Sequence, residues 1–176
     1  MFIDETTVEV LAGNGGSGMA AFRREKYVPK GGPSGGDGGR GGSVYLVGAQ
    51  GIWTLLDYTY RRKWSAGNGK HGGPNQETGK SAGDIVLPVP LGTTVRDADS
   101  GDLLGEVLAD GQRLLVAKGG RGGQGNQHFA TPTHQAPHEY QVGEDGQQRR
   151  VRLTLKLIAD VGLLGEPNAG KSTLLA

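Results

Sequence analysis

The chain has 176 residues, of which 34 are glycine, 19 are lysine or arginine, 18 are aspartate or glutamate, and none is cysteine. The formal net charge of +1 argues against a generally cationic coat for nucleic acid, so any RNA contact must come from local patches. The lack of cysteine excludes a disulfide framework and a cysteine metal site, and the lack of a leader-like start or a long apolar run predicts a cytoplasmic protein without a membrane segment.

The first predicted element is a strand over residues 6–11. Thr6, Val8 and Val10 alternate with their neighbours, so they fall on one face, as in a strand with one buried side. The glycine run at residues 13–18 ends this strand.

A basic segment follows over residues 20–30, with Phe22 and Tyr27 interleaved among its cationic side chains. Basic and aromatic side chains in combination suit RNA, because they offer phosphate contacts and stacking surfaces. The alternative is a solvated loop whose aromatic side chains anchor it to the core. The residue types leave both interpretations open.

The glycine tract at residues 30–43 restricts the fold most strongly. From Gly32 onward it repeats in threes, with glycine at one or two places of each triplet and a polar side chain at the third. Three residues per turn is the period of polyproline II, so every third residue lies on the same side of the helix. Each of the three places of the triplet therefore forms one stripe along the helix. This helix has no internal hydrogen bonds, so its buried peptide groups must find partners on neighbouring segments.

Three further glycine tracts, at residues 13–18, 67–73 and 119–125, can supply those neighbours. We therefore predict a bundle of glycine-rich polyproline II helices. A flexible linker, a disordered tract and collagen are the alternatives. Collagen fails because the triplets come in short blocks between strand-like runs of one chain, and the register that recurs in separate tracts disfavours a linker.

Short strands are predicted between the glycine tracts. The runs occupy residues 44–47, 84–89 and 93–96, and prolines in the second run favour an edge strand. The turn signals Asp99-Ser100-Gly101 and Asp110-Gly111 predict two hairpin-like connections. We expect a small β-barrel or sandwich that provides the apolar core that glycine cannot.

Candidate RNA contacts are the cationic and aromatic side chains at or beside the ends of glycine tracts, since a rigid bundle would present them together. They are Arg23, Arg24, Lys26, Tyr27, Lys30, Lys70, His71 and Arg121. A second basic, aromatic patch lies at residues 58–64. The alternative for all of these side chains is that they only solvate loops.

Two of the four histidines, His134 and His138, have a spacing that would suit a metal site on a helix. Pro132 and Pro137 make a helix unfavourable there, so the spacing loses its geometric meaning. We expect these histidines to lie on the surface or to contact RNA.

A phosphate loop is predicted near the end of the sequence. Residues 151–157 alternate, residues 158–164 are almost continuously apolar, and together they resemble a strand that enters a parallel sheet. The pattern that follows directly matches the phosphate loop in its required context of strand, loop and helix start. Its residues are Gly165, Glu166, Pro167, Asn168, Ala169, Gly170, Lys171 and Ser172.

The phosphate loop assigns a role to each of its residue types. Glycine allows backbone amides to close around the phosphates, Lys171 can reach the β- and γ-phosphates, and the Ser172 hydroxyl can ligate magnesium. The acid, switch and base-selecting motifs of a GTPase would lie after Ala176. We therefore expect residues 1–176 alone to bind no nucleotide and to be catalytically inactive.

The motifs taken together resemble the Obg family of bacterial GTPases over the whole chain. They are GNGGSG at 13–18, FRREKYVPKGGP at 22–33, GGDGGRGG at 35–42, KGGRGGQGN at 118–126 and PNAGKS at 167–172. The resemblance implies a mainly β Obg domain over residues 1–157, with a glycine-helix bundle on a small β-barrel or sandwich. Residues 158–176 would be the start of an α/β P-loop GTPase domain.

The resemblance also implies a function. Members of the family hydrolyse GTP, bind magnesium with GTP or GDP, and act in maturation of the large ribosomal subunit, and some respond to guanosine tetraphosphate in stress. The Obg domain reaches the peptidyl-transferase region in the manner of a tRNA, so the implied partners are the large subunit and its ribosomal RNA. We expect a monomer.

Two residues of the predicted loop carry further implications of the resemblance. The Pro-Asn-x-Gly-Lys-Ser form is similar to that of potassium-activated GTPases, in which the asparagine, here Asn168, touches the cation. Glu166 departs from the family, which more often has an apolar or aromatic residue there. An acid at this position would weaken nucleotide binding if it faced the phosphates, and would have no such effect if it faced solvent.

Two other functions stay open. One is an RNA- or protein-binding module with a vestigial phosphate loop, and the other is a P-loop ATPase or kinase that carries a glycine-rich structural domain. The motifs Asp-x-x-Gly and Asn-Lys-x-Asp after residue 176 would distinguish a guanine-specific GTPase from both.

Overall fold

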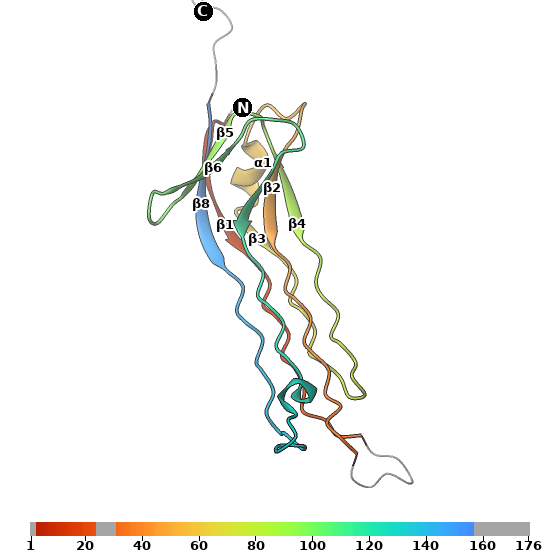
Figure 1. Cartoon of the computed structure of the whole chain (residues 1–176). Coiled ribbons are helices and arrows are strands. Elements are labelled where there is room, and N and C mark those ends of the chain that lie inside the picture. The colour runs from red at the N-terminus through yellow and green to blue at the C-terminus, as the bar shows by residue number, and fades with distance from the viewer. Residues whose placement is uncertain (1–2, 24–30, 157–176) are drawn as a thin grey trace, which may run out of the picture.

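The structure, a computed structural model, describes residues 3–23 and 31–156. The elements in chain order are β1 (Glu5–Leu11), β2 (Val44–Gly48), α1 (Leu56–Tyr60), β3 (Lys63–Ser65), β4 (Ile85–Val89), β5 (Thr93–Asp97), β6 (Leu103–Val107), β7 (Arg113–Ala117), the 3-10 helix η1 (Asn126–Phe129) and β8 (Gln148–Leu155). Figure 1 shows the strands gathered at one end, from which long extended segments run side by side toward the other end. Among the described residues, no helix has the length and apolar character needed to cross a bilayer.

Two sheets form the strand end of the molecule. The five-stranded sheet has the order β3-β1-β8-β5-β6, and the three-stranded sheet has the order β4-β2-β7. The prediction of a mainly β chain is confirmed. Both sheets are mixed, because β3 is parallel to β1 and β4 is parallel to β2.

The inward faces of the strands form one apolar core. The predicted alternation of Thr6, Val8 and Val10 is confirmed, since all three are buried on β1. Leu46 and Leu153 from the two sheets are fully buried in the same core. The core therefore lies between the sheets, where it can offset the entropy lost by ordering many glycines.

The helix α1 closes this core through Tyr58. Its hydroxyl donates a hydrogen bond to the Pro88 carbonyl oxygen at 2.5 Å. Burial, with a smaller contribution from Asp57, raises the pKa of the Tyr58 phenol. The phenol therefore stays neutral and keeps its proton for the bond to β4.

One of the two predicted hairpins is confirmed and the other is wrong. The turn at residues 99–101 joins β5 and β6 as antiparallel neighbours. After the turn at Asp110-Gly111, however, β7 pairs with β2 in the other sheet. The Gln112 side chain accepts hydrogen bonds from the amides of Leu108 and Ala109 and donates one to the Glu106 carbonyl, so it satisfies groups that a strand partner would otherwise bond.

Six extended segments run side by side from the sheets. They are residues 12–19, 34–43, 66–73, 77–84, 118–125 and 141–147. Backbone hydrogen bonds between them recur every third residue. The amides of Gly13, Gly16 and Met19, for example, donate to the carbonyls of Gly42, Gly39 and Gly36 at 2.9, 2.8 and 3.1 Å.

The four predicted glycine tracts belong to this bundle, and two of its segments, 34–43 and 12–19, form its centre. Segment 34–43 bonds to segments 12–19, 66–73, 77–84 and 118–125, and segment 12–19 bonds to 34–43, 66–73, 118–125 and 141–147. The outer segments 77–84 and 141–147 each bond to only two of the others among the described residues.

The outer segments, which have fewer neighbours, contain less glycine than the others, because a residue whose backbone contacts another backbone has no room for a side chain. Segment 34–43 has six glycines, whereas the outer segments 77–84 and 141–147 have two each. A Cβ atom on Gly38 would lie 1.8 Å from the Gly16 carbonyl oxygen, and one on Gly13 would lie 1.7 Å from that of Gly67.

Backbone conformation does not explain these glycines. The described glycines with positive φ are Gly51, Gly92, Gly101, Gly105 and Gly111, and all five lie outside the six segments. In the bundle, glycine is therefore required for close approach of backbones, and not for a left-handed conformation.

This requirement predicts a difference between two glycine-to-alanine changes. Gly38→Ala places a methyl group against backbone and is expected to cost about 1–3 kcal/mol or more, which lowers the melting temperature by roughly 2–10 °C in a domain of this size. Gly83→Ala is the matched control, because a Cβ on Gly83 would meet no atom within 4 Å. Thermal denaturation followed by circular dichroism measures both, and equal melting temperatures for the two variants would contradict this packing.

Candidate functional site

The end of the bundle farthest from the sheets is made of residues 19–23, 31–33 and 126–140, which we call the bundle tip (Figure 1). It contains η1 and, among its charged side chains, Arg23. The described side chains among the predicted RNA contacts lie at the tip or along the sides of the bundle, so the geometry of both decides what these residues can contact.

Asn126 ties the segments together at the tip. The side chain is fully buried, its Oδ1 accepts a hydrogen bond from the Gly35 amide at 2.8 Å, and its Nδ2 donates to the carbonyls of Ala21 and Pro137 at 3.0 Å each. Its own amide donates to the Met19 carbonyl. One buried side chain thus joins three stretches of chain, which makes the tip a fixed structure.

Asp37 and His128, whose side chains are both partly exposed, add further contacts beside Asn126. One carboxylate oxygen of Asp37 accepts from the Gly125 amide at 2.7 Å, and the carboxylate lies 3.0 Å from Nε2 of His128. The reasoning from sequence identified neither Asn126 nor this pair. The only local signal was an asparagine directly after the glycine tract 119–125.

The other histidines of the tip have separate partners. His134 lies 3.2 Å from Glu139, and the ring of His138 packs on that of Phe22 with centroids 4.8 Å apart. The pKa of Glu139 is lowered first by its own backbone amide and then by His134. Within the described ranges, no group of three or more histidine, cysteine, aspartate or glutamate side chains could hold a metal ion.

Two of the predicted RNA contacts, Lys70 and His71, lie together on one side of the bundle. Both are exposed and, with Lys80, line a hollow of about 320 Å³ between segments 66–73 and 77–84. The Nδ1 atom of His71 accepts a hydrogen bond from the Ser17 amide at 3.0 Å. The neutral ring therefore carries its proton on Nε2. Glu77 also lines this hollow, so its charge is mixed.

Arg121 lies on another side of the bundle. Segments 66–73 and 118–125 both bond to the central pair and, in the described part of the chain, not to each other, so they lie on opposite sides of that pair. Arg121 and Arg23 are exposed, and the Arg23 amide donates to the Gly32 carbonyl at the tip. The four described candidates therefore surround the bundle, and do not form the single cluster that the sequence suggested.

The remaining predicted site residues lie outside the described residues. They are the RNA candidates Arg24, Lys26, Tyr27 and Lys30, and the phosphate-loop residues Gly165, Glu166, Pro167, Asn168, Ala169, Gly170, Lys171 and Ser172.

The second basic, aromatic patch, at residues 58–64, lies at the strand end of the molecule. The Arg61 guanidinium lies 4.0 Å from the centroid of the Trp64 ring, and the Trp64 Nε1 donates to the Arg61 carbonyl. Lys63 lies 3.5 Å from Glu9 on the neighbouring strand. These contacts within the domain explain the composition of the patch without an RNA partner.

Comparisons with known proteins give one consistent family. The model of the family described as GTP1/OBG matches residues 3–157. The chain is 55% identical to the GTPase Obg of Chlorobaculum parvum over 175 residues, which are 99% of this chain and 52% of that protein. It is 57% identical to the GTPase Obg of Lactobacillus acidophilus, covering 99% of this chain and 40% of the relative.

A third relative, the GTPase Obg of Lactiplantibacillus plantarum, is 56% identical over 176 residues, which are 100% of this chain and 41% of that protein. The chain therefore spans about half, or less, of the length of these relatives.

Proposed function

Because the chain belongs to the GTP1/OBG family, we propose that it is the ribosome-binding part of a regulatory protein that hydrolyses GTP. The observation that carries this proposal is the family match over residues 3–157, together with the name GTPase Obg that the relatives carry. The complete protein acts in maturation of the large ribosomal subunit, and in the response to stress through guanosine tetraphosphate. It works in the cytoplasm as a monomer.

Residues 1–157 form the Obg domain in this proposal, and residues 158–176 begin the GTPase domain. The six extended segments are polyproline II helices. Three features support this conformation: the three-residue recurrence of the hydrogen bonds between segments, the lack of hydrogen bonds inside any segment among the described residues, and the φ of −75° and ψ of 166° at Gly125.

The predicted phosphate loop binds the nucleotide. Backbone amides of the stretch Gly165 to Gly170 surround the phosphates, Lys171 neutralises the β- and γ-phosphates, and Ser172 supplies a hydroxyl ligand to Mg²⁺. A hydroxyl oxygen fits this metal, because Mg²⁺ prefers hard oxygen ligands. Asn168 is the residue through which K⁺ acts.

The bundle is the element that enters ribosomal RNA. It is rigid because each segment is bonded backbone to backbone to at least two others. Its cations are distributed around it, with Arg23 at the tip, Lys70 on one side and Arg121 on the opposite side. A finger with charges on several sides suits a cleft lined by phosphates better than a flat surface. Arg24, Lys26, Tyr27 and Lys30 add contacts of the same kind.

Binding to the large subunit tests the role of these cations. The affinity is expected to fall steeply between about 50 and 200 mM salt. In a plot of the logarithm of the binding constant against the logarithm of the salt concentration, Lys70→Gln and Arg121→Gln are each expected to lower the magnitude of the slope by about one, since each removes one phosphate contact. Tyr27→Ala is expected to cost roughly 1–3 kcal/mol with little change in slope, if a base stacks on the ring.

Lys63→Gln is the control for this series, because Lys63 lies at the strand end and pairs with Glu9. Co-sedimentation with purified large subunits measures all four variants. Equal binding of Lys70→Gln, Arg121→Gln and the parent at every salt concentration would refute the proposed contacts.

Nucleotide binding by the complete protein tests the other half of the proposal. Lys171→Ala is expected to abolish tight binding of GTP and GDP, and Ser172→Ala to remove the dependence of binding on Mg²⁺, because each loses a contact to the phosphates or the metal. Calorimetric titration measures both, with Lys63→Ala as the control. Undiminished GTP affinity of Lys171→Ala would show that the nucleotide binds elsewhere.

A further inference from the structure

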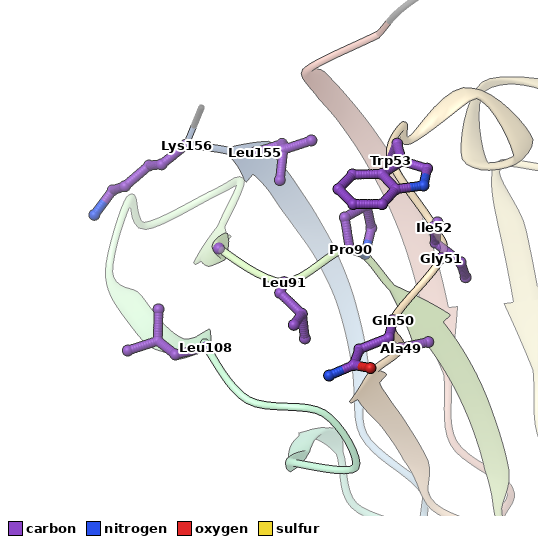
Figure 2. A pocket seen from close by; sticks show the side chains of 11 residues that line it. Ala49, Gln50, Gly51, Ile52, Trp53, Pro90, Leu91, Leu108, Leu155 and Lys156 are labelled. Carbon is purple, nitrogen blue, oxygen red and sulfur yellow. The ribbon is translucent and has the colours of Figure 1, made fainter. Parts of the chain in front are cut away.

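An open apolar groove lies at the strand end, beside the point where β8 ends. Its volume is about 780 Å³, and it is lined by residues 49–53, residues 90–92, Leu108 and Leu155–Lys156. Figure 2 shows these side chains, which come from four separate stretches of chain, around one opening. We call it the exit groove.

The exit groove exposes large apolar side chains that the domain itself does not use. Trp53 is 77% exposed and Leu108 is 64% exposed, whereas Leu55, two residues after Trp53, is fully buried in the core. An indole with this exposure contributes little to the folding of its own domain. Large exposed apolar side chains that line one hollow are typical of an interaction site.

The end of β8 is fixed at the edge of this groove by three hydrogen bonds. The Leu155 amide donates to the Asp4 carbonyl at 2.7 Å, and the Lys156 amide donates to the Gly92 carbonyl at 3.1 Å. The Lys156 Nζ donates to Glu106 Oε1 at 2.5 Å, and this contact lowers the pKa of Glu106. The position of Lys156 is thus set by main chain and side chain together, and the chain continues from the wall of the groove.

The short distance along the chain restricts what can lie in the groove. The predicted phosphate loop begins at Gly165, nine residues after Lys156 (165 − 156), so even a fully extended link would span only about 30 Å, close to the diameter of a small domain. The tether also keeps that domain at a high effective concentration beside the groove. A second copy of the chain has neither advantage.

We propose that the exit groove is the docking site for the nucleotide-binding domain that follows Lys156, an inference that rests on the proposed function. The domain covers Trp53 and Leu108 with an apolar patch of its own. The groove thereby sets the direction in which the glycine bundle points relative to the bound nucleotide.

The accessibility of Trp53 in the complete protein tests this docking. Acrylamide quenching is measured for the parent and for Trp53→Phe, and the difference isolates the signal of Trp53. We expect this difference signal to be quenched several-fold more slowly than free indole, at all protein concentrations. Quenching close to that of free indole would overturn the proposal, and protection that disappears on dilution would overturn it in favour of a second copy.

Matched substitutions provide the second measurement. Leu108→Asp is expected to undock the domain, restore rapid quenching of Trp53 and increase the radius of gyration measured by small-angle X-ray scattering. Leu103→Asp is the control, because Leu103 is 54% exposed on β6 and does not line the groove. Equal radii for the two variants would contradict docking at this groove.

GTP titration of the same samples separates failure of the inference from failure of the proposed function. If the complete protein binds GTP while Trp53 stays accessible, the docking site is refuted and the proposed function stands. If Trp53 is protected but GTP does not bind, the following domain still docks there, and the proposed nucleotide function is the part that fails.

Discussion

The backbone hydrogen bonds between glycine segments are the interaction on which the rest of this molecule depends. At the centre of the bundle they bring two backbones so close that a Cβ atom would lie about 2 Å from a carbonyl oxygen, as at Gly38 and Gly13. Such a bundle has almost no apolar side chains of its own. Its large loss of chain entropy on folding must therefore be offset by these bonds and by the apolar core between the two sheets.

This constraint also explains how the bundle carries charge. On a central segment, two of every three residues face other backbones and are glycine, and the third is free to be polar, as with Asp37 and Arg40. Polar side chains can thus surround a rigid finger that has no apolar core. In our proposal this arrangement brings cations to ribosomal RNA from several sides, and the sheets hold the finger beside the nucleotide domain.

Much of this architecture could be predicted from sequence, because three-residue periodicity and two-residue alternation are both local patterns. Segments 77–84 and 141–147 were not predicted, because an outer segment contacts fewer backbones and needs fewer glycines. The three-residue spacing of Gly143 and Gly146 was the one local signal for segment 141–147. Other features depend on contacts far apart in the chain. Asn126 bonds to Gly35 and Ala21, 91 and 105 residues away, and the order of segments around the bundle separates Arg121 from Lys70.

Amide hydrogen exchange measured by nuclear magnetic resonance tests the central claim most directly. The amides of Gly38 and Gly41 donate to segment 118–125, and those of Gly39 and Gly42 donate to segment 66–73. If backbone pairing holds the bundle, these four glycine amides will exchange as slowly as the paired amides of β1, many orders of magnitude below the rate of an unfolded chain. Exchange at the unfolded rate, while β1 stays protected, would contradict the account.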